Sequence, residues 1–187
     1  MLLKTQNTNQ TQNSKMKTIK FFGALTIFFS FMTFVGQAQD KSDRPSPPQT
    51  AEATVKGTKV LIDYSSPAAK GRDLYGDLVP YGKIWRTGAN EATTVTVDKD
   101  VKIGGKTLKA GKYALFTIPG ENDWEIIINS EWDQWGAYNY DASKDVLRTS
   151  VKPMKTDSNV ESLRFTIDEG GLVVMAWGDT QVPFKIE

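Results

Sequence analysis

The chain contains no cysteine and no histidine among its 187 residues. Without cysteine it can form no disulfide, carries no thiolate nucleophile and offers no attachment point for a lipid or a haem. Without histidine it lacks the usual general base of serine hydrolases and the usual zinc and copper ligand. We therefore expect no cofactor, and any catalysis would rest on carboxylates, lysine, tyrosine or serine.

Residues 1–38 have the order of a secretory signal peptide. Lysines precede the apolar run 21–35, and Gly36-Gln37-Ala38 then supplies small residues at the two positions that a signal peptidase reads. The run is shorter than the roughly 20 residues of a membrane span, so a retained anchor is the less favoured alternative. We expect cleavage after Ala38 and export to the periplasm or out of the cell.

Met16 is a second candidate for the start of translation. The segment 16–20, Met-Lys-Thr-Ile-Lys, would itself open a normal signal peptide, whereas the fifteen residues before it are mostly Asn, Gln, Thr and Ser. The sequence favours Met16 as the true start, with a long polar leader as the alternative.

Export would leave a slightly acidic chain. Removal of residues 1–38 takes away four lysines and no acid, so 19 basic residues remain against 22 acidic ones, a net charge of −3. No block of basic residues survives, and we therefore expect no nucleic-acid partner and no binding to anionic lipid. The remaining length is that of one domain with a sizeable core.

Short strand patterns separated by turn residues recur from residue 51 to the end of the chain. Alternation over 60–64 after Lys56-Gly57 predicts a hairpin, and Gly104-Gly105 predicts another. The run Ile126-Ile127-Ile128 indicates a strand buried on both faces. Near the C-terminus we expect separate strands, the last two at 172–177 and 182–186.

These patterns, with no long helical period, are typical of an antiparallel sandwich or barrel. We predict an all-β, jelly-roll-like antiparallel β-sandwich of about nine or ten strands over residues 51–187. A proline-rich arm at 39–50 precedes it, and we expect this arm to be extended and free of helix. The connections 67–81 and 132–145 are long, and binding sites on β scaffolds usually lie in such loops.

Several motifs in the chain resemble those of a known family. They are Tyr64-Ser65-Ser66-Pro67, Lys70-Gly71-Arg72, the run 79–93, Ala110-Gly111-Lys112-Tyr113, Ile118-Pro119, Trp124, Trp135-Gly136 and Tyr140-Asp141. On these residues the sequence resembles the secreted bacterial domain-of-unknown-function family 2911, over about residues 45–187. The resemblance implies an exported single-domain β protein of unestablished activity, and it assigns no catalytic residue.

The run 85–93 gathers a cation, a carboxylate, an amide, two hydroxyls and an indole around one glycine. One interpretation is a pocket in which Arg86 grips an anionic group while Asn90 and Glu91 orient hydroxyls. The alternative, which we favour, is structural. In it Arg86 pairs with Glu91, and Asn90 satisfies the backbone of a tight loop at Gly88.

Arg72 is a second candidate cation. If Arg72 and Arg86 converged, they would favour an anionic ligand, because the guanidinium group matches carboxylate and sulfate geometry. An ordinary exposed ion pair of Arg72 with Asp73 or Asp77 is the favoured alternative.

The connection 132–140 carries four aromatic side chains. Flat rings on a β-sandwich loop are what sugar-binding modules use, so Trp135 and Tyr140 are candidate ligand-binding residues. The favoured alternative is that the rings fold inward as a small satellite core.

Carboxylates offer two further possibilities. Several aspartates could bind calcium, but their spacing lacks the EF-hand pattern, so we predict no metal site and expect them to form turns. Glu91 with Glu125 or Asp141 could serve glycoside hydrolysis.

The sequence therefore predicts an exported module that binds a small molecule or a glycan through the loops 85–93 and 132–140. Its candidate ligand-binding residues are Arg72, Trp85, Arg86, Asn90, Glu91, Trp135 and Tyr140. The alternatives are a carboxylate-based hydrolase that uses Arg86 and Glu91, and a structural or protein-interaction module of the cell envelope.

Overall fold

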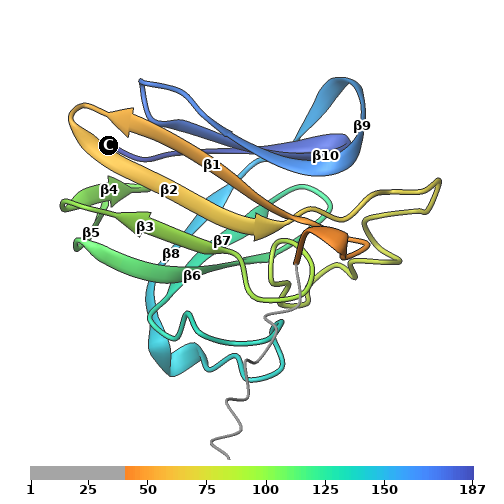
Figure 1. Ribbon diagram of the computed structural model, residues 1–187, viewed down its shortest axis with the longest axis horizontal. Helices are drawn as coiled ribbons and strands as arrows, with labels where there is room; N and C mark the ends of the chain where they lie inside the picture. The colour runs from red at the N-terminus through yellow and green to blue at the C-terminus, as the bar shows by residue number, and fades with distance from the viewer. Residues whose placement is uncertain (1–40) are drawn as a thin grey trace, which may run out of the picture. The chain divides into compact units, whose positions relative to one another are not determined.

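Two antiparallel layers of strands make up residues 41–187, the part of the chain that the computed structural model describes (Figure 1). The prediction of an all-β antiparallel sandwich is confirmed. The predicted signal peptide, 1–38, and the candidate start at Met16 lie outside the described residues. Within residues 41–187, no helix has the length and apolar character that a membrane span requires.

The first layer is a six-stranded sheet in the order β1-β2-β3-β6-β7-β8, antiparallel throughout. Its strands are β1 (Pro48–Val55), β2 (Thr58–Ser65), β3 (Thr94–Val97), β6 (Gly111–Ile118), β7 (Trp124–Asn129) and β8 (Asp145–Val151). β1 and β2 form the predicted hairpin. Lys56 and Gly57 adopt φ values of 50° and 81°, the left-handed pair that a two-residue type I′ turn requires.

The second layer is a ribbon of β9 (Met154–Ile167) and β10 (Leu172–Lys185). The Gly104-Gly105 hairpin, β4 (Val101–Ile103) and β5 (Lys106–Leu108), joins it through a bridge between Ile103 and Ile186. The separate strands expected at 172–177 and 182–186 are in fact one strand. Pairing with β9 continues past Gly178 because the register shifts on both sides of it, as in a β-bulge.

The main core lies between the two layers and is filled by alternate side chains of the facing strands. Members of this core include Val60, Ile62, Val95, Val97, Leu163, Phe165, Val173 and Met175. The β7 isoleucines are buried on both faces, as predicted. Ile126 and Ile128 belong to the main core, while Ile127 joins Ala92, Ala114 and Phe116 in a second cluster. Burying each such large apolar side chain contributes about 1.5–3 kcal/mol.

The N-terminal arm departs in part from the expected extended form. Lys41–Asp43 makes a single 3-10 turn, η1, which can form because the prolines begin only at Pro45. From Pro48 the arm becomes β1, the edge strand of the large sheet, with Pro48 opposite Ser65. An edge strand tolerates proline because one side of its backbone has no partner strand.

Candidate functional site

Residues 85–93 form a loop that is closed by its own hydrogen bonds. The Thr93 hydroxyl donates to the Thr87 carbonyl at 2.9 Å, and the Trp85 indole N–H donates to the Gly88 carbonyl at 3.1 Å. At the base of the loop, the Thr93 N–H donates to the Arg86 carbonyl at 3.2 Å. Trp85, a candidate ligand-binding residue, is buried in the main core and stacks on Trp177.

Two residues of this loop adopt left-handed backbone conformations without being glycine. Thr87 and Asn90 both have φ of 57°. For Thr87, which is β-branched, this value is an outlier and costs of order 1–3 kcal/mol. Tertiary hydrogen bonds hold them there. Thr87 Oγ1 donates to Thr117 Oγ1 at 3.1 Å, and Asn90 Nδ2 donates to the Ser46 carbonyl of the arm at 3.0 Å. Thr87 also bonds to the loop's own backbone, at the Trp85 carbonyl, whereas Asn90 bonds to the arm and not, as expected, to the loop at Gly88.

Glu91 is bound by the arm and not by Arg86. Arg44 Nη1 donates to both carboxylate oxygens, at 3.0 and 2.9 Å, and Lys41 Nζ donates to Oε1 at 3.0 Å. The expected Arg86–Glu91 ion pair is therefore not formed. Burial raises the pKa of Glu91, but the bonds from its own backbone N–H, Arg44 and Lys41 outweigh it and lower the pKa to about 2.

Arg86 lies beside the 132–140 loop. Its Nη1 is 3.5 Å from the point that a Cβ would occupy on Gly136. Its Nε is buried without a hydrogen-bond partner, and none of the carboxylates in residues 41–187 forms an ion pair with it. Arg86 thus carries a half-buried positive charge that no described acid neutralises.

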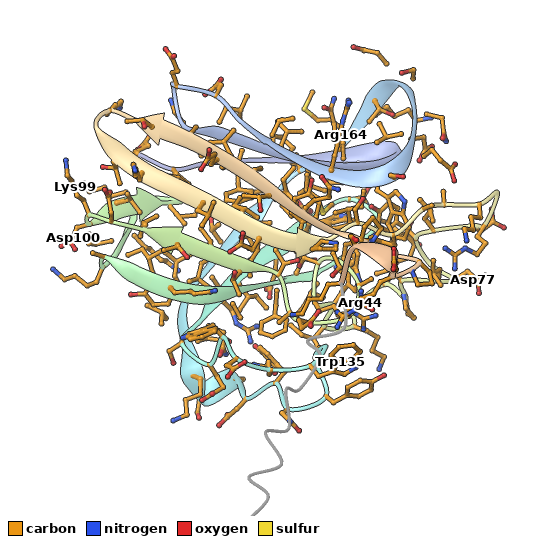
Figure 2. The ribbon with its side chains drawn as sticks, viewed as in Figure 1. Arg44, Asp77, Lys99, Asp100, Trp135 and Arg164 are labelled. Carbon is orange, nitrogen blue, oxygen red and sulfur yellow. The ribbon has the colours of Figure 1, made fainter. Side chains whose placement is uncertain are left out.

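A cleft of about 440 Å³ opens between the arm, the end of β2 and the 132–140 loop. Trp132 and Trp135 line it, and 40% and 53% of their surfaces stay exposed. A cation lies over each ring: Lys112 Nζ is 4.5 Å from the Trp132 centroid, and the Arg44 guanidinium is 5.8 Å from that of Trp135. Figure 2 shows Arg44 next to Trp135 below the arm. Polar groups in the lining come from Lys41, Asp63, Ser65, Glu91, Thr94, Lys112, Asp133 and Gln134.

Tyr140, at the end of the same loop, is part of a satellite core. Its ring packs edge-on against Phe116 at 5.1 Å. Its hydroxyl donates to Asp145 Oδ2 at 2.7 Å and accepts from Arg148 Nη2 at 2.6 Å. Burial and the bond to Asp145 raise the pKa of Tyr140 to about 12. The satellite-core interpretation thus applies to Tyr140, whose ring packs against Phe116. The ligand-binding interpretation is left to Trp132 and Trp135, which remain exposed.

A family model described as "Protein of unknown function (DUF2911)" matches residues 46–186. The chain belongs to this family. The comparison with curated proteins found no match, nor did the comparison with solved structures. The DUF2911 match contains both loops of the cleft and begins at Ser46, the residue whose carbonyl binds Asn90. It leaves out Lys41 and Arg44, the two cations that bind Glu91.

Arg72 lies in another part of this DUF2911 domain. Its Nε and Nη2 donate to the carbonyls of Ala69 and Ala68, at 2.9 and 2.6 Å, so it stabilises its own loop. It forms no ion pair with Asp73 or Asp77, and it lines a cleft different from that of Trp135.

Three of the aspartates considered as metal ligands cap turns. Asp98 accepts the Lys59 N–H at 2.8 Å, Asp100 accepts the Ala110 N–H at 3.0 Å, and Asp141 caps η2 (Ala142–Lys144). Within residues 41–187, no group of three or more acidic side chains is placed to hold a metal ion. Glu125, a possible partner of Glu91 in hydrolysis, bonds to Arg148 and does not line the cleft.

Sequence reasoning did not anticipate that the arm would contribute to the cleft. Arg44 is 47 residues away from Glu91, and nothing in the local pattern joins them. Lys112 and Trp132 had a weak signal. Lys112 belongs to one of the family motifs and Trp132 to the predicted connection 132–145, but only the fold brings the lysine over the ring.

Proposed function

We propose that this DUF2911 protein is an exported module that binds a glycan in the cleft between the arm and the 132–140 loop. The observation that carries the proposal is the division of the five tryptophans. Trp85, Trp124 and Trp177 are buried in the core, whereas Trp132 and Trp135 are exposed and line one cleft. Large aromatic surface that the fold leaves exposed at a concave site indicates binding.

A sugar ring matches this cleft in two respects. Its C–H face is apolar and stacks on an indole, while its hydroxyls need hydrogen-bond partners. Asp63, Asp133 and Gln134 in the lining offer such partners around the two rings. Lys112 and Arg44, each held over one ring, fix the indoles in place before a ligand arrives, which lowers the entropic cost of binding.

The alternative of a carboxylate-based hydrolase would assign a role to Glu91, which lines the same cleft. A general acid needs a pKa raised towards neutrality, because it must hold a proton until the reaction. The pKa of Glu91 is lowered to about 2 and its carboxylate is bonded to two cations. These contacts argue against Glu91 as the general acid, and neither Glu125 nor Asp141, its predicted partners in hydrolysis, lines the cleft.

Glycan-array screening of the purified protein, followed by calorimetric titration of the best binder, tests the proposal. We expect Trp132→Ala and Trp135→Ala each to weaken binding by about tenfold or more, as truncation of a central aromatic does at binding sites. Tyr138→Ala is the matched control: Tyr138 belongs to the same loop and is 83% exposed, yet it does not line the cleft. The control should bind as the wild type does.

Two results would contradict the proposal. One is the absence of saturable binding to any glycan on the array. The other is a glycan whose affinity is unchanged by both tryptophan substitutions.

A further inference from the structure

A second concave region lies between the loop 66–84 and the strands β9 and β10. Two clefts of about 580 and 200 Å³ adjoin there, and both are lined by Tyr75, Tyr81, Asp179 and Thr180. We call the two together the Tyr75 groove. Figure 1 shows the loop, in yellow and olive, extending beyond the ends of the strands. The Tyr75 groove shares no lining residue with the cleft of Trp132 and Trp135.

A bulge in β10 shapes one wall of the groove. Pairing with β9 shifts register on both sides of Gly178, whose φ is 65°. Leu74 of the loop approaches this glycine so closely that its Cδ1 would lie 2.7 Å from an added Cβ. Bulges redirect neighbouring side chains, and here the next residue, Asp179, lines both clefts.

Tyr75 lines both clefts of the groove and has an unsatisfied hydroxyl. Its ring packs edge-on against Trp124 at 5.0 Å and against Trp177 at 6.3 Å, which fixes its position. The hydroxyl oxygen is buried and has no hydrogen-bond partner, a state that is unfavourable for a polar group. Burial, Asp179 and Tyr81 raise the pKa of Tyr75, so the hydroxyl stays protonated.

The groove carries more negative than positive charge. Four acids line it, Asp73, Glu121, Glu161 and Asp179, against the two cations Arg72 and Lys155. Among residues 41–187, none of these four acids forms an ion pair. Asp179 accepts one hydrogen bond, from the hydroxyl of its neighbour Thr180 at 3.1 Å. Arg72 is occupied by its own loop's carbonyls.

We propose that the Tyr75 groove binds an organic ammonium ion of the linear di- or polyamine class. The ammonium groups pair with Asp179 and the neighbouring carboxylates, while the methylene chain lies along the tyrosine rings. Ammonium groups are attracted both to carboxylates and to the faces of aromatic rings. A small metal ion fits less well, because no three acidic side chains of residues 41–187 converge on one point. This site is independent of the proposed glycan cleft.

Calorimetric titration of the purified protein with spermidine at constant ionic strength tests the inference. We expect saturable binding, weakened tenfold or more by Asp179→Asn. Asp179 is exposed, so this change leaves the fold intact. Asp77→Asn is the matched control, since Asp77 is an exposed acid of the loop 66–84 that does not line the groove (Figure 2). It removes the same charge and should leave the affinity unchanged.

The inference is overturned if spermidine shows no saturable binding. It is also overturned if Asp179→Asn and Asp77→Asn weaken binding equally, because that result would indicate general attraction to an acidic surface. Both variants should melt at the temperature of the wild type, so a loss of binding cannot be ascribed to unfolding.

Discussion

Glu91 connects the arm to the cleft, since it lines the cleft while Arg44 and Lys41 bind its carboxylate. Its pKa falls from an ordinary 4.5 to about 2 in the folded protein. A depressed carboxyl pKa stabilises the fold above the unfolded value, and this contribution is lost as the pH falls from about 4.5 to 2. Because the pair is partly exposed, we expect the contribution to be small, about 0.5–1 kcal/mol.

Glu91→Gln tests this linkage by urea unfolding at several pH values. At pH 7 the variant should be less stable than the wild type, and the difference should vanish as the pH approaches 2. A difference in unfolding free energy that stays constant from pH 7 to pH 2 would show that the carboxylate charge is not what binds the arm.

Gly88 is the residue of the 85–93 loop that admits no side chain. An added Cβ would lie 2.9 Å from Thr93 Oγ1 and 3.0 Å from the Ser65 carbonyl. We expect Gly88→Ala to destabilise the protein by about 1–3 kcal/mol through overpacking, measured by thermal or urea unfolding. Gly170→Ala is the control, because its Cβ would approach only the end of the Asp168 side chain, at 3.2 Å. Equal effects of the two changes would contradict the account.

Single residues also show where sequence reasoning fails. Asn90 was predicted to satisfy the backbone of a tight loop at Gly88, because asparagine favours turns, but its side chain bonds to Ser46 of the arm. The partner of Glu91 was predicted wrongly. Arg86 is the nearest cation in sequence, but the left-handed residues between them turn the chain, and a distant arginine of the arm reaches Glu91 instead. Only the tertiary fold determines that choice.

The 132–140 loop contains residues that pack against the sheet and other residues that line the cleft. Tyr140 anchors it to the sheet through Phe116, Asp145 and Arg148, while its tryptophans face the cleft. Tyr140→Phe removes two hydrogen bonds to charged groups, and we expect it to destabilise the protein by about 1–3 kcal/mol with glycan affinity unchanged. Trp135→Ala should weaken glycan binding and leave the free energy of unfolding unchanged. Urea unfolding measures the stability of each variant, and calorimetry measures its glycan affinity. If both variants changed both quantities alike, the prediction would be contradicted.

At the level of strands, the sequence predicted the sheet well because alternation and glycine turns are local signals. The hairpin turns at Lys56-Gly57 and Gly104-Gly105 and the doubly buried run of β7 lie where the sequence predicted them. β10 was divided because the stretch from Gly178 to Gln181 has the composition of a turn. In the fold, left-handed Gly178 forms a bulge, and the pairing continues. Local composition cannot distinguish a bulge from a turn, since both use glycine at positive φ.

At the scale of the whole molecule, the absence of cysteine determines what can stabilise the protein. The chain contains no cysteine and so no disulfide, and if it is exported as proposed its stability outside the cytoplasm rests on the core between the two layers. We expect the protein recovered from the periplasm or the medium to begin at Gln39, as N-terminal sequencing would show. Recovery of chains that retain residues 1–38 would contradict cleavage after Ala38.

The central claim is that a glycan covers Trp132 and Trp135, and acrylamide quenching of tryptophan fluorescence tests it most directly. Trp85, Trp124 and Trp177 are buried, so quenching in the free protein comes from the two exposed rings. We predict that the glycan selected on the array reduces quenching in a saturable manner, and that in Trp135→Ala, which keeps Trp132 as the exposed reporter, the same protection needs about tenfold more glycan. A glycan that binds the wild type and leaves acrylamide quenching unchanged would contradict the claim.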